Sequence, residues 1–296
     1  MTTIGFIGLG SMGAPLAGRL LPGNTVYGTN RTKAKAAGLI EQGLIWRDTP
    51  REVAAAAQVL FSMVTDDTAL AAITSGPDGI LAGLRPGTGY VEMSTVSPQA
   101  SRELAGQVRS AGATMIDAPV SGSVPAARSG TLSIMVGGSE EAFHAAEPLL
   151  NRLGSNITHV GGNGQGLLLK LAINISLAAQ MLAFSEGVLL AERGGIDPEL
   201  AARAMTASAI GSPMLQARLP LVLDLPEQAW FDVHLMHKDI RLALAAARQA
   251  GIVLPAALAA DNTLTEAEQM GYEHRDIASL FQVLARIPSA PAKAAA

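Results

Sequence analysis

Two polar side chains interrupt a long apolar segment that the sequence predicts to be helical. Lys170 and Asn174 are four residues apart, so they lie on one face of that helix. A lysine that faces a cleft without water has its ammonium form disfavoured, which makes it suitable for general acid–base catalysis. We therefore predict Lys170 as the catalytic acid or base and Asn174 as the group that orients a substrate oxygen. Such pairs are more often found on a solvated helix face, but this helix is apolar almost all round.

A second polar segment follows a short apolar run that is predicted to be a strand. It reads Asp117-Ala118-Pro119-Val120-Ser121-Gly122-Ser123. Doubly wound sheets bind their ligands at the carboxyl ends of parallel strands. The hydroxyl of Ser121 and the backbone N–H groups of Gly122 and Ser123 are suited to hold a carboxylate, so we predict that these three residues bind the substrate. An ordinary strand–turn–helix connection, which uses the same residue types, is the alternative.

A glycine-rich turn near the N-terminus matches the dinucleotide-binding pattern G-x-G-x-x-G. A strand-like run, 3–7, precedes it and a helix-like run, 14–21, follows it, which is the context that this pattern requires. The first glycine permits the tight turn, the second lets the backbone approach a pyrophosphate, and the third lets helix and strand pack closely. The residues predicted to bind the cofactor here are Gly8, Leu9, Gly10, Ser11, Met12 and Gly13, and a glycine-rich strand–helix turn without a ligand is the alternative.

The type of dinucleotide is predicted from the end of the second strand. An acid at that place usually holds the ribose 2′-hydroxyl, but this chain has Asn30, followed by Arg31 and Thr32. Neutral donors and a guanidinium are suited to a 2′-phosphate, which an acid would repel. We therefore predict NADP(H) as the cofactor, bound by these three residues. The alternative is that Arg31 is an ordinary solvated charge of the loop.

The elements that must position these groups follow a βαβ rhythm. Strand-like runs alternate with helix-length segments as far as a glycine cluster at 161–164, and beyond it the pattern is helical. The fold class predicted is α/β, with an N-terminal Rossmann-type doubly wound sheet and an all-α C-terminal domain. The domains are 1–162, which binds NADP, and 163–296, which begins with the long helix and serves substrate binding and dimerisation. The predicted strands are Thr3–Gly8, Thr25–Thr29, Val59–Val64, Thr88–Met93, Thr114–Pro119, Leu132–Val136 and Ile157–Val160.

Composition excludes several functional classes. The chain has 296 residues and no cysteine, so disulfides, thiol catalysis, Cys-ligated zinc and iron–sulfur clusters are ruled out. With 21 Lys and Arg against 25 Asp and Glu, its net charge of −4 argues against a nucleic-acid partner. His234 and His237 are three apart, but no third ligand accompanies them at a known spacing, so no metal is predicted.

We also predict no membrane partner. The most apolar segment, 167–190, carries Lys170, Asn174, Gln180 and Glu186, which a lipid-spanning helix would have to hide at several kcal/mol each. The N-terminus lacks the basic region and cleavage site of a secretory signal, so a cytoplasmic location is expected. Helices that are apolar all round imply more buried surface than one helical lobe needs, and we therefore expect a homodimer or a homotetramer.

Taken together, these motifs resemble the β-hydroxyacid dehydrogenases, a family that includes 3-hydroxyisobutyrate dehydrogenases and tartronate semialdehyde and glyoxylate/succinic semialdehyde reductases. The resemblance extends over essentially the whole chain. Within the family, the glyoxylate/succinic semialdehyde reductases are the most similar, through Asn30-Arg31, Phe231 and residues 211–214. The motifs that carry the resemblance are residues 5–13, residues 117–122 with 130–132, residues 166–174 and Lys238-Asp239.

The resemblance implies roles for further residues. Thr95 would lie beside the nicotinamide, and Met63 and Val64 would pass under the adenosine half. Lys238 would contact the cofactor from the second domain. It also implies that Lys170 is the acid/base and that Asn174 and Ser121 hold the substrate.

Phe231 and Asp239 complete the predicted substrate side. Phe231 would help exclude water from the site. Asp239 would form an ion pair that positions Lys238, an ordinary surface pair being the alternative.

The activity implied is NADPH-dependent reduction of a small aldehyde acid, such as glyoxylate, succinic semialdehyde or tartronate semialdehyde, or the reverse oxidation of a hydroxy acid. Lys170 would protonate the developing alkoxide while the Ser121 cradle holds the carboxylate. Two alternatives remain open. One is reduction of imines, against which the retained Lys170 argues. The other is a non-catalytic NADP-binding sensor, which would have no need of Lys170, Asn174, Ser121 and Thr95 together.

Overall fold

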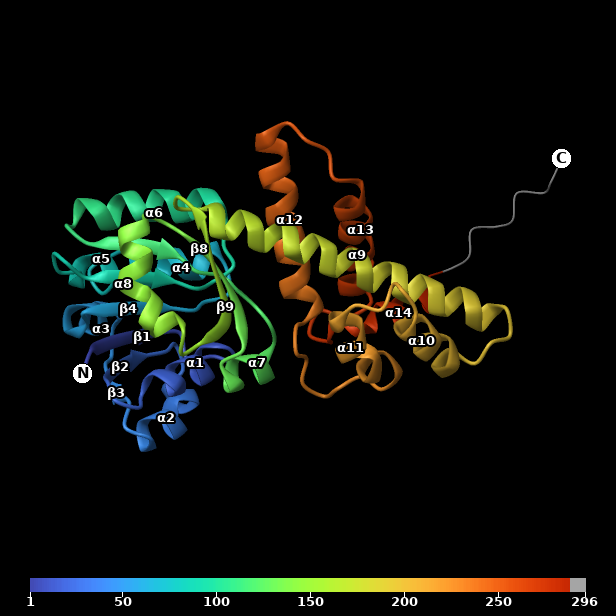
Figure 1. Ribbon diagram of the computed structural model, residues 1–296, viewed down its shortest axis with the longest axis horizontal. Helices are drawn as coiled ribbons and strands as arrows, with labels where there is room; N and C mark the ends of the chain where they lie inside the picture. The colour runs from blue at the N-terminus through green and yellow to red at the C-terminus, as the bar shows by residue number, and fades with distance from the viewer. Residues whose placement is uncertain (288–296) are drawn as a thin grey trace. The chain divides into compact units, whose positions relative to one another are not determined.

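The computed structural model describes residues 1–287 and divides into two compact units. Unit 1 is Met1–Leu171 and unit 2 begins at Ala172. The last part of the predicted second domain, residues 288–296, lies outside the described residues. Helix α9 (Gln165–Arg193) contributes residues to both units (Figure 1).

Unit 1 is built on one mostly parallel sheet of nine strands. The strand order is β3-β2-β1-β4-β5-β6-β8-β7, with β9 paired to β8. Its first six strands have the 3-2-1-4-5-6 order of dinucleotide-binding sheets, which confirms the predicted Rossmann-type fold. The strands are β1 (Thr3–Ile7), β2 (Thr25–Thr29), β3 (Ile45–Trp46), β4 (Val59–Ser62), β5 (Gly89–Glu92), β6 (Thr114–Asp117), β7 (Val120–Ser121), β8 (Leu132–Gly137) and β9 (Gly154–Gly161).

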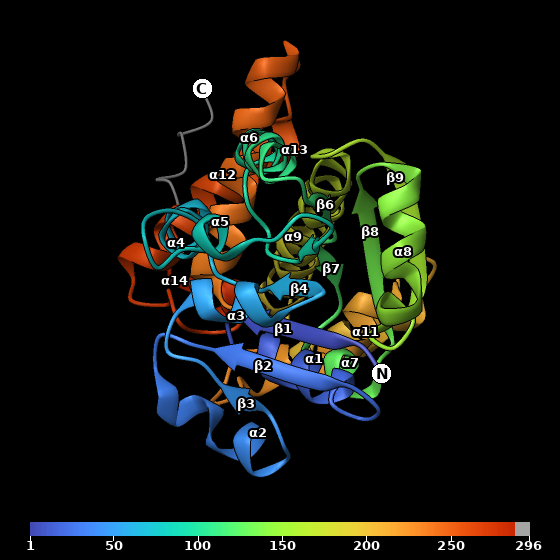
Figure 2. The ribbon, with the colours of Figure 1, turned by 90° about the vertical axis from the view of Figure 1, so that its left-hand side faces the viewer.

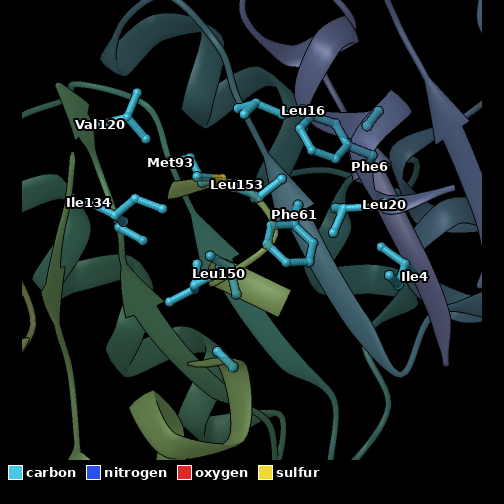
Figure 3. Close-up of a cluster of buried hydrophobic side chains, with 14 of the residues drawn as sticks. Ile4, Phe6, Leu16, Leu20, Phe61, Met93, Val120, Ile134, Leu150 and Leu153 are labelled. Carbon is cyan, nitrogen blue, oxygen red and sulfur yellow. The ribbon is translucent and has the colours of Figure 1, made fainter. Parts of the chain in front are cut away.

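Helices cover both faces of this sheet because successive strand residues point to opposite sides (Figure 2). Phe6 belongs to a core with α1 (Gly13–Leu20) and α8 (Glu140–Leu150). Ile7 belongs to a second core with α3 (Pro50–Ala56) and α6 (Pro98–Ser110). The rings of Phe6 and Phe61 stack with centroids 5.9 Å apart in the first core (Figure 3). The helices are α1 (Gly13–Leu20), η1 (Lys33–Ala36), α2 (Ala37–Glu41), α3 (Pro50–Ala56), α4 (Asp67–Thr74), α5 (Ile80–Gly83), α6 (Pro98–Ser110), α7 (Val124–Ser129) and α8 (Glu140–Leu150).

The sheet differs from the prediction at its far edge. Strand β8 runs antiparallel to β6 and β7, whereas the strands of a doubly wound sheet are expected to be mostly parallel. The reason is the short connection, because only ten residues separate β7 from β8 and a parallel crossover needs a dozen or more. Strands β3 and β7 were not predicted, because two residues are too few to show a pattern.

The regular elements in the described part of unit 2 are all helices, which confirms the predicted class of the C-terminal domain. Beyond the glycine cluster, the described residues contain a single isolated bridge, Asp232 to Asp276, and no strand. Its core contains apolar side chains from α9, α12 (Val233–Ala250) and α13 (Pro255–Gln269), among them Phe184, Ile240 and Leu264. The helices after α9 are α10 (Pro198–Ala207), α11 (Pro213–Leu223), α12 (Val233–Ala250), α13 (Pro255–Gln269), η2 (Ile277–Ser279) and α14 (Leu280–Arg286).

Helix α9 is long and apolar enough to cross a membrane by length and composition alone. Its apolar residues, however, pack inside the protein. Leu167 belongs to a core of unit 1, and Met181, Phe184 and Val188 belong to the core of unit 2. This packing supports the interpretation of α9 as a core helix.

Candidate active site

The parallel register brings the predicted cofactor residues to one edge of the sheet. Ile7, the last residue of β1, is level with Thr29 and Ser62, the last residues of β2 and β4. Gly8, Asn30 and Met63, the next residues of each strand, therefore emerge side by side. The N–H of Gly8 donates to the carbonyl of Thr29 (3.0 Å), and the N–H of Met63 donates to that of Ile7 (2.9 Å).

The three fingerprint glycines differ in what a side chain would meet. A Cβ at Gly8, where φ is +93°, would overlap the carbonyl oxygen of Met63, and one at Gly13 would overlap the carbonyl oxygen of Gly8. A Cβ at Gly10 would have no atom within 4 Å. The outer glycines are thus required by packing, while the middle one borders open space at the start of α1. This is the arrangement that a pyrophosphate needs, so the turn fits a dinucleotide.

Alanine substitutions at two of these glycines are expected to have different effects. Gly8→Ala is strained and overlaps backbone, so it should lower the free energy of unfolding by about 1–3 kcal/mol in urea titrations. Gly10→Ala should leave that free energy unchanged but weaken NADPH binding by about tenfold or more, since about 1.4 kcal/mol corresponds to tenfold in Kd. Fluorescence titration with NADPH measures the second effect. Unchanged binding in a folded Gly10→Ala protein would contradict the assignment of this turn.

The side chain of Asn30 is occupied within the turn. Its Oδ1 accepts from the N–H of Leu9 (3.1 Å), and its Nδ2 donates to the carbonyl of Thr32 (3.0 Å). Asn30 therefore ties the glycine turn to the loop after β2. Arg31 and Thr32, next to it, are exposed. An aspartate at position 30 would keep the first hydrogen bond, but as a carboxylate it could not donate the second.

A buried polar network joins the loops after β4 and β5. The N–H of Val64 donates to Ser94 Oγ (2.8 Å), and the N–H of Ser94 donates to Glu92 Oε1 (2.7 Å). Glu92 and Ser94 are fully buried. Met63 and Val64 are thereby fixed relative to Thr95, the residue that follows Ser94. Sequence reasoning missed Glu92 and Ser94, although an acid inside the apolar run 88–93 was a usable indication.

A buried tyrosine of β5 makes a hydrogen bond to β4. The hydroxyl of Tyr90 lies 2.7 Å from the Oγ of Ser62, which is the last residue of β4. Burial, with the nearby charge of Glu92, raises the pKa of Tyr90 well above its usual value, so its hydroxyl stays protonated at neutral pH.

The predicted carboxylate cradle lies at the turn between β7 and α7. Ser121 ends β7, opposite Ser133 of β8, and Ser123 occupies the residue before α7. Gly122 has a φ of +133°, and a Cβ there would lie 2.7 Å from Leu132 Cδ2. Ser121, Gly122 and Ser123 therefore form the turn between β7 and α7, and Gly122 is exposed. The turn requires glycine at its centre on steric grounds alone.

Lys170 and Asn174 occupy successive turns of α9. Lys170 is 8% exposed and Asn174 is fully buried, which matches the burial inferred from the apolar helix. A buried lysine or asparagine side chain needs polar partners, because burying a polar group without a hydrogen bond costs free energy. In unit 2 the Nδ2 of Asn174 donates to Asp239 Oδ2 (2.5 Å).

Asp239 is the centre of the polar cluster in unit 2. Its Oδ1 lies 3.0 Å from the Nζ of Lys238, so its two oxygens contact Lys238 and Asn174 respectively. The ion pair expected from the sequence is therefore present, and Asp239 is buried rather than part of an ordinary surface pair. Phe231 is half-buried in the loop before α12, where its N–H donates to Asp276 Oδ2 (3.1 Å).

The two histidines considered as metal ligands have carboxylate partners. His237 lies 3.0 Å from Asp261 Oδ1 and 2.9 Å from Glu268 Oε2, and His234 lies 3.1 Å from Glu268 Oε1. Burial acts to raise the pKa of Glu268, but the hydrogen bonds of these histidines outweigh it and lower that pKa. Over residues 1–287 no group of three or more His, Cys, Asp or Glu side chains is arranged to hold a metal ion.

Two family models together cover almost the whole described chain. Residues 3–161 match the NAD binding domain of 6-phosphogluconate dehydrogenase. Residues 164–284 match the NAD-binding domain of NADP-dependent 3-hydroxyisobutyrate dehydrogenase.

Individual relatives agree with the models. The chain is 32% identical to the chloroplastic glyoxylate/succinic semialdehyde reductase 2 of Arabidopsis thaliana, over 95% of this chain and 79% of that protein. It is 34% identical to the 3-hydroxyisobutyrate dehydrogenase of Pseudomonas aeruginosa, over 94% and 96%. The structure of Psf3 in complex with NADP+ and 2-OPP superposes with a TM-score of 0.87 at 30% identity, over 95% and 99%. The chain belongs to the 3-hydroxyisobutyrate dehydrogenase-like β-hydroxyacid dehydrogenases, NAD(P)-dependent oxidoreductases that act on CH–OH groups.

Proposed function

We propose that the protein is an NADPH-dependent reductase of small aldehyde acids, such as glyoxylate, succinic semialdehyde and tartronate semialdehyde, and that it also catalyses the reverse oxidation of hydroxy acids. The observation that carries the proposal is the buried Lys170 on an apolar helix of a dinucleotide-binding protein. Enzymes of this family bind small hydroxy-acid substrates, and relatives are named for glyoxylate, succinic semialdehyde and 3-hydroxyisobutyrate. A cytoplasmic location and a homodimer or homotetramer belong to the same proposal.

The chain's own residues would bind, orient and protonate the substrate. When bound, the dihydronicotinamide supplies a hydride for the carbonyl carbon. Lys170 gives a proton to the carbonyl oxygen, and Asn174, whose amide is oriented by Asp239, steadies that oxygen. Ser121 and the N–H groups of Gly122 and Ser123 hold the carboxylate, while Phe231 excludes water.

Other residues would hold the coenzyme. The pyrophosphate would lie against residues 8–13, and Met63 and Val64 would pass beside the adenosine half. Thr95 would lie at the nicotinamide, and Lys238 would contact the coenzyme from the domain 163–296. The geometry that supports these roles is the open space at Gly10 and the hydrogen bond between Val64 and Ser94.

We further propose that NADPH is preferred over NADH. Arg31 and Thr32 are exposed next to Asn30, where a 2′-phosphate would need a cation and neutral donors. Arg31→Ala should raise KM for NADPH by about tenfold, since a hydrogen bond to a charged group contributes about 1.5–3 kcal/mol, and leave KM for NADH within twofold.

Steady-state kinetics with both coenzymes measure this difference. Arg109→Ala is the control, because Arg109 is also exposed but lies in the last turn of α6, and its KM values should not change. A wild-type preference for NADH, or equal effects of Arg31→Ala on both coenzymes, would contradict the assignment.

The proposed reaction is tested with a substrate panel. NADPH oxidation is measured with glyoxylate, succinic semialdehyde, tartronate semialdehyde and simple cyclic imines, and NADP+ reduction with 3-hydroxyisobutyrate. We expect turnover with at least one aldehyde acid and none with the imines. Turnover with imines alone would favour imine reduction, and the absence of turnover with every compound would favour a non-catalytic NADP-binding sensor.

A further inference from the structure

A buried carboxylate at the end of β6 holds the start of α9. Asp117 is fully buried, and its Oδ1 accepts from the N–H of Gly164 at 2.6 Å. Its Oδ2 accepts from the N–H of Leu167 at 3.1 Å. Gly164 directly precedes α9, and Leu167 lies in its first turn. The N–H groups at the start of a helix have no hydrogen-bond partners inside that helix. Asp117 thus caps this helix from about fifty residues away in sequence.

Close packing of backbone makes this contact possible. A Cβ at Gly166 would lie 2.8 Å from Asp117 Oδ2 and 2.5 Å from the carbonyl oxygen of Met135. A Cβ at Gly137 would lie 2.7 Å from the same carboxylate oxygen. Nearby, Asn163 Nδ2 donates to the carbonyl of Met115 (2.9 Å). The start of α9 is therefore fixed against β6 and β8 at several points, with the carboxylate at the centre.

The charge of Asp117 suits the helix but is costly to bury. A carboxylate at a helix N-terminus interacts favourably with the helix dipole. Burial nevertheless raises the pKa of Asp117 above its usual value, although hydrogen bonds from Gly164, Leu167 and Asn163 act to lower it. A raised folded-state pKa means that the stability this group contributes is greatest at low pH and is lost as pH rises through that pKa.

The position of the first turn of α9 determines where the proposed catalytic lysine lies, because both belong to one helix. Lys170 follows Leu167 by three residues, so less than one helical turn separates it from an amide that Asp117 holds. We propose that Asp117 is a positioning residue, whose carboxylate fixes the first turn of α9 and thereby places Lys170 for proton transfer. This inference rests on the proposed role of Lys170. Asp117 itself is fully buried with both oxygens accepting from backbone, so it is not assigned to the substrate.

The test is the conservative variant Asp117→Asn, studied in the full chain. The amide keeps the volume of the side chain but places an N–H₂ donor against one of the two backbone N–H groups. We expect hydrogen exchange of the amides at 164 and 167 to become at least tenfold faster. We also expect kcat to fall about tenfold or more, since a small misplacement of a reacting group has effects of up to about a hundredfold, while Kd for NADPH stays within twofold.

Two further variants make the test specific. Gly166→Ala keeps the carboxylate but pushes α9 away from it, so it should reproduce the fall in kcat. Asp197→Asn is the control, because Asp197 caps α10 through the N–H of Leu200 (2.9 Å) and should leave kcat unchanged. The inference is overturned if Asp117→Asn loses protection at 164 and 167 but keeps wild-type kcat, or if both amides stay protected. Failure of the proposed function itself is recognised separately, by a Lys170→Ala enzyme that remains active.

Discussion

Replacing Lys170 with alanine is expected to lower kcat by about a hundredfold or more, with NADPH binding unchanged. General acid catalysis contributes about 10²–10⁴-fold, and the proposed reaction has no other buried amine on α9 to supply the proton. The measurements are kcat with the best substrate of the panel and the Kd for NADPH from fluorescence titration. Near-native turnover with intact coenzyme binding would show that Lys170 does not transfer the proton.

A second substitution separates proton transfer from simple electrostatic stabilisation. Lys170→Arg keeps a positive charge at this position, but a guanidinium does not give up its proton at neutral pH. We therefore expect the arginine enzyme to be slowed about as much as the alanine enzyme. Recovery of most of the wild-type kcat by arginine would instead assign Lys170 the role of a fixed charge beside the developing alkoxide.

The second large effect is expected on stability, from the buried ion pair of unit 2. Arg218 Nη1 lies 2.5 Å from Asp276 Oδ1, and both side chains are buried. Burial lowers the pKa of Arg218, while the charge of Asp276 acts to raise it. Asp276 also accepts from the N–H groups of Trp230 and Phe231 at 2.9 and 3.1 Å, so it holds the loop that carries Phe231.

Asp276→Ala should therefore lower the free energy of unfolding by about 3–5 kcal/mol, because it leaves the guanidinium of Arg218 buried without its partner. Urea unfolding at neutral pH measures this change. Glu199→Ala is the control, since it breaks an exposed ion pair with Arg203 and should cost no more than about 0.5 kcal/mol. A loss below about 1 kcal/mol for Asp276→Ala would contradict the importance of this pair.

The features that the sequence predicted well are those encoded by neighbouring residues. The turn at 8–13 has its glycines, its strand and its helix within one short segment, so the pattern alone defines it. The burial of Lys170 and Asn174 could be predicted because α9 is uninterrupted and its apolar residues surround them. The strand order also agrees with the α/β class, which the alternation of strand-like and helix-length segments predicts.

The features that were missed depend on contacts between distant segments. Nothing near Asp117 in sequence indicates that its carboxylate meets the amides of Gly164 and Leu167. The antiparallel direction of β8 depends on the connection through α7, whose six residues carry no pattern that distinguishes it from a longer crossover helix. Likewise, Asp276 was not predicted to hold the loop of Phe231, because the two are about 45 residues apart.

Transfer of deuterium is the most direct test of the central claim, reduction of an aldehyde acid by NADPH. The wild-type enzyme is incubated with NADPH that is deuterated at both transferable positions of the nicotinamide ring, together with each aldehyde acid of the panel, and the products are analysed by mass spectrometry. We predict a hydroxy acid that carries one deuterium on the former carbonyl carbon. The absence of any deuterated hydroxy acid, from every aldehyde acid tested, would contradict the proposed function.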